Sequence, residues 1–168
     1  GVTNSEVMLK GISRVLPGRF GLRVKSELYK EDFYDLVKKY NRAAKKAKEP
    51  QVELQKSGVI DVATVWRSFK PDVLLEAKTS NKSQVDRWTK QVTGYVDQGI
   101  PIIWGVMLGL YSENKALPQS FGGHMRLIIG YNLEKGEIIF TDSWGAGHEK
   151  KTIPIREAMA MTTGMHVI

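Results

Sequence analysis

Cysteine is absent from the 168 residues of this sequence. Its absence excludes disulfide bonds, thiolate metal sites and a cysteine nucleophile within the chain, and it leaves the redox compartment unreadable. Long apolar runs are absent too. The longest, residues 100–110, contains a proline and two glycines, and it is much shorter than the roughly 20 residues that span a membrane. We therefore predict no membrane span.

Acidic residues are fewer than basic residues. The sequence contains 18 Asp and Glu and 25 Lys and Arg, which gives a net charge of +7. This excess allows nucleic acid or anionic lipid as a partner, but it does not identify a fold. Hydrophobic residues make up 42% of the chain, which excludes a disordered protein, and the length predicts a single domain over residues 1–168. The first residue is Gly1 rather than Met. We therefore expect a chain that was processed, as exported proteins are, or that lost an upstream segment, and its location is unknown.

Helical patterns dominate residues 1–98. Capping boxes that begin at Thr3 and Asn81 precede apolar repeats of helical spacing, and Asp61 is a further N-cap candidate. Pro71 is interpreted as an interruption that follows a short helix. We predict one strand over residues 22–28 and helices over residues 3–16, 31–48, 62–69 and 82–98.

Strand patterns dominate residues 99–168. They predict strands over residues 100–108, 124–131, 137–141 and 151–155, followed by a short helix over residues 156–162. Helices that precede an antiparallel sheet are typical of the α+β class, in contrast to alternating βαβ units. We therefore expect one α+β domain, in which residues 1–98 are mainly helical and residues 99–168 form the sheet.

Two of these strands form a predicted hairpin whose open end carries polar residues. If the chain turns around residues 133–136, His124 at the start of the first strand lies beside Asp142, which follows the second. A carboxylate beside an imidazole fixes which ring nitrogen carries the proton and stabilises the imidazolium, as in a catalytic triad. From spacing alone, however, a structural pair is the more common explanation.

The sequence around this pair carries a family resemblance. Residues 123–131, GHMRLIIGY, and residues 141–145, TDSWG, resemble the C-terminal half of papain-like cysteine peptidases. In that family, a strand that begins with the catalytic His is followed by one that ends in Asn-Ser-Trp-Gly or Asp-Ser-Trp-Gly. The Asp variant is similar to the bacterial branch related to double-glycine, bacteriocin-processing peptidases. The resemblance covers the chain from residue 99 onward.

The resemblance implies a papain-like fold, thiol-dependent hydrolysis of a peptide bond, and a peptide or protein substrate. It makes His124 the general base and acid, Asp142 its orienting group and Trp144 the shield of their hydrogen bond. Gly123 and Ser143 belong to the same motifs and are supporting residues. Neither a metal nor a cofactor is implied.

The departure from the family pattern concerns the nucleophile. Such peptidases place a Cys at the N-terminus of a central helix, a few residues after a Gln that helps to form the oxyanion hole, and neither is visible here. We therefore expect a papain-like fold that is incomplete at its N-terminus. The Cys would come from a missing segment or from a partner chain.

Two alternatives belong to other functional classes. A catalytically inactive relative that binds peptides keeps the fold and the cleft and needs no thiol. A basic nucleic-acid-binding domain is favoured less, because the basic face of the predicted helix over residues 31–48 lacks the aromatic or amide side chains that contact bases. Its five cations are Lys38, Lys39, Arg42, Lys45 and Lys46, and a solvated face explains them more simply.

Two metal-site hypotheses are weaker. Residues 71–72, PD, and 76–78, EAK, resemble the metal motif of restriction-type nucleases, but three intervening residues are too few to join the two strands on which that motif lies. His124, His148 and the glutamate after His148 lack the helical spacing of zinc ligands, so a solvated His148 is favoured. His166 has no partner that the sequence reveals.

Overall fold

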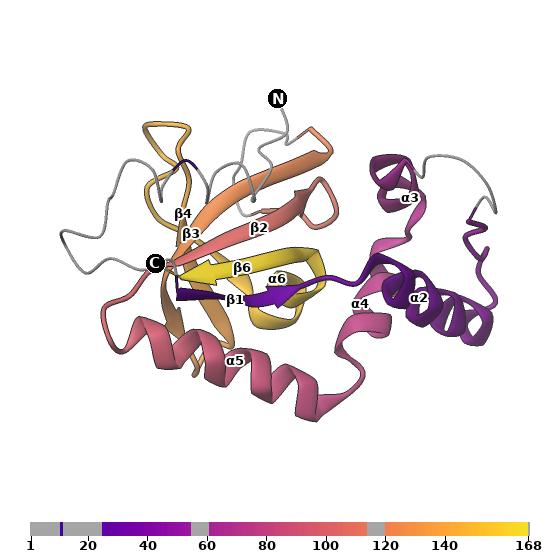
Figure 1. The fold of residues 1–168 in the computed structure, drawn as a ribbon, viewed down its shortest axis with the longest axis horizontal. Helices are drawn as coiled ribbons and strands as arrows, with labels where there is room; N and C mark the ends of the chain where they lie inside the picture. The colour runs from indigo at the N-terminus through magenta and orange to yellow at the C-terminus, as the bar shows by residue number, and fades with distance from the viewer. Residues whose placement is uncertain (1–10, 12–24, 55–60, 114–119, 168) are drawn as a thin grey trace.

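A six-stranded antiparallel sheet forms the centre of the computed structural model, which describes residues 11, 25–54, 61–113 and 120–167 (Figure 1). The strands are β1 (Lys25–Lys30), β2 (Ile102–Leu108), β3 (Gly122–Asn132), β4 (Glu137–Thr141), β5 (Lys151–Pro154) and β6 (Thr162–Val167). Their order in the sheet is β1-β6-β2-β3-β4-β5. The helices are α2 (Phe33–Ala47), α3 (Val62–Ser68), α4 (Pro71–Thr79), α5 (Lys82–Val96) and α6 (Ile155–Met161).

The central strand β2 is buried along its whole length, as its unbroken apolar sequence predicts. Helices α5 and α6 contact this part of the sheet, and the core lies between them and the strands. Trp104 of β2 is fully buried there, with its ring edge-to-face against Phe140 at a centroid distance of 5.4 Å. Its indole Nε1 donates to the hydroxyl of Thr162 at 2.8 Å, so the buried polar group is satisfied.

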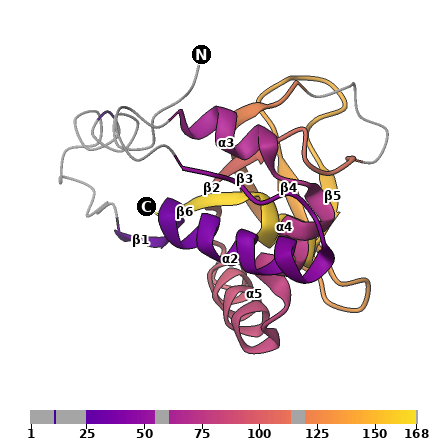
Figure 2. The same ribbon diagram turned by 90° about the vertical axis from the view of Figure 1, so that its right-hand side faces the viewer.

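Helices α2, α3 and α4 gather at one end of the sheet, while α5 runs beneath it (Figures 1 and 2). The sequence predicts α2, α3 and α5 correctly, because their caps and apolar stripes are local signals. Asp61 accepts from two backbone N–H groups at the start of α3, and Asn81 accepts from Gln84 N at the start of α5. No helix in the described ranges is long and apolar enough to cross a membrane.

Two elements differ from the sequence-based prediction. Pro71 follows α3, as predicted, but it also begins a further helix, α4. In the first turn of a helix the backbone N–H groups have no partner within the helix, so a proline there costs no hydrogen bond. The sequence pattern does not predict the last strand, β6, which lies between β1 and β2, next to the edge strand β1 of the described sheet. The predicted helix over residues 3–16 lies outside the described residues except for residue 11, and the predicted strand over residues 22–28 overlaps β1. The α+β class itself is confirmed.

Candidate functional site

The hairpin of β3 and β4 brings His124 and Asp142 together. Leu127 of β3 pairs with Thr141 of β4, so Asp142 follows directly after the last paired residue, near the start of β3. His124 Nε2 lies 2.7 Å from Asp142 Oδ1. The imidazole is one-fifth exposed and the carboxylate is fully buried. The two side chains thus form a close pair in which only the imidazole reaches solvent.

Three further groups hold the carboxylate of Asp142. The backbone N–H of Ser143 donates to Oδ1 at 3.1 Å, and Arg126 Nε donates to Oδ2 at 2.9 Å. Lys151 Nζ lies 3.8 Å from Oδ2. Burial by itself would raise the pKa of Asp142, but the hydrogen bond with His124 and the positive charges of Arg126 and Lys151 hold it below its ordinary value. Asp142 is therefore a carboxylate at neutral pH and can only accept.

The ion pairs continue behind Asp142 into a buried network. Arg126 also donates to Glu113, and Lys151 donates to Glu113 Oε2 at 3.1 Å. The side chains of Arg126 and Glu113 are almost completely excluded from solvent. Among the described residues, the carboxylates of Asp142 and Glu113 therefore face the cations of Arg126 and Lys151, and each buried charge has a partner of opposite sign.

Sequence reasoning missed this network. The alternation of a strand was an available signal for Arg126, since it lies two residues after His124 and so on the same face of β3. Glu113 follows β2 in a loop, where no periodicity indicates a partner. Its role depends on the tertiary structure.

Trp144 stacks on the imidazole. The ring centroids of His124 and Trp144 lie 4.4 Å apart with an angle of 22° between the planes, and 44% of the Trp144 surface is exposed. Arg126 and Lys151 lie within 6 Å of the same indole ring, at 5.8 Å and 5.5 Å from its centroid. The indole therefore covers the side of the network that would otherwise meet water.

A closed loop over residues 142–148 positions this indole. Asp142 N donates to His148 O, and His148 N donates to Gly145 O, both at 3.0 Å. Gly145 and Gly147 adopt positive φ angles of 86° and 85°, which glycine reaches without steric cost. The sequence-based expectation of a solvated His148 is wrong. The residue is 8% exposed and packs edge-on against Trp144 at a centroid distance of 5.6 Å. Within the described part of the chain, its Nδ1 has no hydrogen-bond partner.

A cavity of about 330 Å³ adjoins the pair. His124 and Gly123 contribute to its wall, together with Gly105 and Gly164 from the neighbouring strands. Gly123 pairs with Met107 across β2 and β3. Ser143 does not line the cavity and is exposed. Near His124 the wall thus includes backbone without side chains.

The other candidate residues lie apart from any metal-binding arrangement. Residues 71–72 and 76–78 belong to one helix, α4, and not to two strands, and Lys78 is buried in an ion pair with Glu31. Within the described ranges, no group of three or more His, Asp or Glu side chains is placed to hold a metal ion. The basic face of α2 is exposed, as the solvated-face interpretation predicts.

His166 is buried in β6, next to β1. It is 4% exposed, and burial lowers its pKa; the nearby Lys30 acts in the same direction, whereas Glu27 opposes it. Among the described residues, its Nδ1 has no hydrogen-bond partner. No local pattern in the sequence predicts a buried histidine at this position.

The fold described above is the α+β fold of papain-like cysteine peptidases. A family model described as the Peptidase_C39 like family matches residues 26–162, and the chain belongs to that family. Comparisons with curated proteins and with solved structures found no match. The chain is therefore a peptidase-like domain without a cysteine among its 168 residues.

Proposed function

We propose that residues 1–168 form one peptidase-like domain that contributes the acid–base half of a thiol-dependent peptidase. The nucleophilic Cys would come from a polypeptide segment outside these residues. The observation that supports this proposal most directly is the 2.7 Å contact between His124 and Asp142 beside a cavity. Family membership supports the class of reaction, which is hydrolysis of a peptide bond.

The contact between His124 Nε2 and Asp142 Oδ1 indicates which nitrogen of the His124 ring would act as the base in the proposed reaction. Because Asp142 is ionised and only accepts, His124 Nε2 carries a hydrogen and donates it to Oδ1. His124 Nδ1 then holds the lone pair. In the proposed mechanism, Nδ1 takes the proton from the thiol, and the resulting imidazolium gives a proton to the leaving amine.

Three surrounding features serve this mechanism. Asp142 orients the ring, and Trp144 excludes water from the hydrogen bond between the two side chains. Gly123, next to His124 in the cavity wall, has no side chain that would keep an extended peptide backbone away from the sheet. A peptide or protein is therefore the proposed substrate.

The test uses the complete natural gene product, whether it is one polypeptide or an assembly, in a peptide-hydrolysis assay. Alkylation with iodoacetamide should abolish turnover. His124→Ala should lower kcat/KM by roughly 10²- to 10⁴-fold, the range expected for loss of an acid–base group. Lys82→Ala, an exposed position on α5, is the matched control and should leave turnover unchanged. Turnover that survives both alkylation and His124→Ala refutes the proposal.

A second candidate, a peptide-binding module without catalysis, is favoured by the cavity beside His124 together with a sequence that contains no cysteine. Such a module needs the cavity but no thiol. This candidate predicts saturable binding of peptides to the cavity without hydrolysis in the complete gene product. It also predicts unchanged binding after alkylation.

A further inference from the structure

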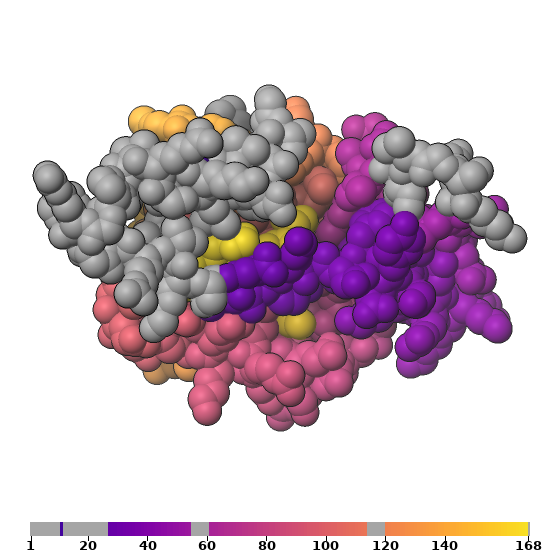
Figure 3. Space-filling view, viewed as in Figure 1, coloured from indigo at the N-terminus to yellow at the C-terminus, as the bar shows by residue number. Residues whose placement is uncertain are grey.

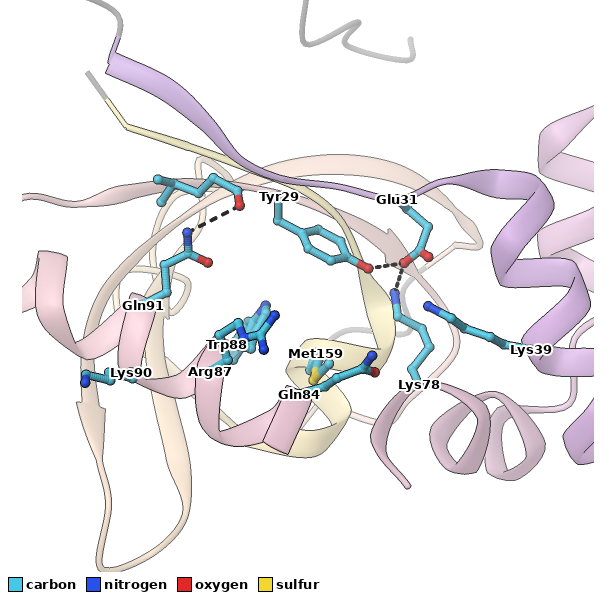
Figure 4. Close-up of a pocket in the computed structure, with 11 residues that line it drawn as sticks. Tyr29, Glu31, Lys39, Lys78, Gln84, Arg87, Trp88, Lys90, Gln91 and Met159 are labelled. Atoms are coloured by element: carbon cyan, nitrogen blue, oxygen red, sulfur yellow. Dashed lines mark hydrogen bonds and ion pairs between the residues drawn. The ribbon is translucent and has the colours of Figure 1, made fainter. Parts of the chain in front are cut away.

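A second cavity, of about 560 Å³, opens between β1 and α5 (Figure 4). It shares only Tyr29 and Glu31 with the cavity beside His124. In Figure 3, β1 lies above α5, and the yellow C-terminal part of the chain is visible in the gap between them. This volume is in the range of small-molecule sites, which enclose about 300–1,000 Å³.

Three basic side chains line this cavity. Lys39 reaches it from α2 and Arg87 from α5 (Figure 4), and Lys90 of α5 also contributes to its wall. All three residues are exposed, and in the part of the chain that the structure describes no carboxylate forms an ion pair with them. Positive charges around a concave surface raise the local concentration of anions.

The one acidic residue in the cavity wall, Glu31, does not neutralise these cations. Its carboxylate forms a buried ion pair with Lys78 and accepts from the hydroxyl of Tyr29. Lys78 Nζ also donates to Thr162 O at 2.8 Å. Burial and the adjacent carboxylate raise the pKa of Tyr29, so the phenol stays protonated. The negative charge of Glu31 is therefore matched within this cluster, and the wall keeps a positive excess.

The floor of the cavity is apolar. Leu28, Trp88 and Met159 supply the apolar surface. Trp88 is only 4% exposed, so its ring closes the floor of the cavity while its indole Nε1 is buried below the surface. Apolar surface of this kind favours a ligand with an apolar body.

The position of β1 at one edge of the described sheet raises the question of an added strand, and a contact of Gln91 argues for a compact ligand instead. Gln91 Nε2 donates to Leu28 O at 3.3 Å (Figure 4). This carbonyl on the outer edge of the strand is therefore already paired, so an incoming peptide would have to displace Gln91 to extend the sheet.

We propose that this cavity binds a small organic anion, with an apolar body and a single carboxylate or phosphate group. The body packs on Trp88 and Met159, and the charged group lies among Lys39, Arg87 and Lys90. The site is separate from the proposed chemistry at His124 and does not depend on it.

The test follows the tryptophan indole resonances of ¹⁵N-labelled protein by NMR. The probes are 2-naphthoate and 2-naphthyl phosphate, and the comparison compounds are the neutral 2-naphthalenemethanol and inorganic phosphate. At least one anionic naphthalene should shift the Trp88 indole resonance, assigned with Trp88→Phe, and bind about tenfold or more tightly than either comparison compound. The naphthalene that binds more tightly identifies the preferred head group.

Substitutions of the basic residues test where the charged group of the ligand binds. Arg87→Gln and Lys90→Gln should each raise Kd by roughly threefold and the double variant by about tenfold. Lys82→Gln on the same helix, outside the cavity wall, is the matched control and should leave Kd unchanged. The proposal is overturned if 2-naphthalenemethanol binds as well as both anions, if Lys82→Gln weakens binding as much as Arg87→Gln, or if the Trp88 resonance does not respond.

Discussion

Arg126 Nε donates to Asp142 Oδ2 at 2.9 Å, on the carboxylate oxygen that His124 does not use. The other oxygen, Oδ1, accepts from His124 and from the backbone N–H of Ser143. The position of the carboxylate is therefore set by Arg126 and the backbone as well as by the imidazole. Asp142 is therefore held in place by groups other than His124, and its Oδ1 orients the His124 ring.

Arg126→Met should destabilise the fold strongly. The substitution removes the Arg126 guanidinium, which pairs with both buried carboxylates, Asp142 and Glu113. Removing one partner from a buried ion pair costs about 3–5 kcal/mol. Urea unfolding followed by tryptophan fluorescence measures this loss. Arg42→Met, at an exposed position of α2, should stay within about 0.5 kcal/mol of the parent, and a similarly small change for Arg126→Met would contradict the role given to the network.

Trp144→Ala should expose His124 to reagents while costing little stability. The indole is 44% exposed and stacked on the imidazole, so its removal should lower the free energy of unfolding by only about 1–2 kcal/mol. Acylation of His124 by diethyl pyrocarbonate, followed by peptide mass spectrometry, should become faster. Tyr34→Ala, at another exposed aromatic residue of 57% exposure, should not change that rate. An unchanged rate in Trp144→Ala would show that the indole does not shield the imidazole.

Because of the buried His166, the free energy of unfolding should decrease in mild acid. Burial lowers the pKa of this histidine in the folded state, with Lys30 adding to the effect and Glu27 opposing it. As the pH falls below the ordinary histidine value of about 6.5, the unfolded chain therefore binds the proton first, and the free energy of unfolding decreases until the lower folded pKa is passed.

Urea unfolding between pH 5 and 7.5 tests this effect in the parent and in His166→Gln. The contribution of His166 is the difference between the two slopes, because other titrating groups are common to both proteins. Glu157, whose pKa burial raises, is one of these groups. Equal slopes in the two proteins would mean that the pKa of His166 is not lowered by folding.

Two glycine substitutions should have opposite effects. A Cβ at Gly105 would lie 2.9 Å from Thr163 Oγ1 and 3.4 Å from Met125 Sδ, so Gly105→Ala should cost on the order of 1–3 kcal/mol. A Cβ at Gly94 of α5 meets nothing within 4 Å, so Gly94→Ala should add about 0.5–1 kcal/mol through helix propensity. Thermal unfolding of the two variants checks the pair. A stable Gly105→Ala would show that β2 and β6 pack less closely than the structure indicates.

The parts of the fold that local signals specify were predictable. The caps at Asp61 and Asn81 and the apolar stripe of α2 act within a few residues, so the sequence reports them directly. α4 was missed because a proline that begins a helix and one that interrupts a chain look alike in sequence. β6 was missed because its strand character depends on pairing with β1 and β2, which are far away along the chain.

In the candidate site, too, some contacts follow from the local sequence and others depend on the packed fold. The sequence by itself determined the approach of His124 to Asp142, since a hairpin with a short loop sets the register of residues 18 positions apart. Only the tertiary structure decided that Glu113 joins Arg126 and that Lys78 meets Glu31, 47 positions away. A buried charge takes whichever partner the folded chain brings within reach, and residues from separate elements come within reach only after the sheet and the helices have packed.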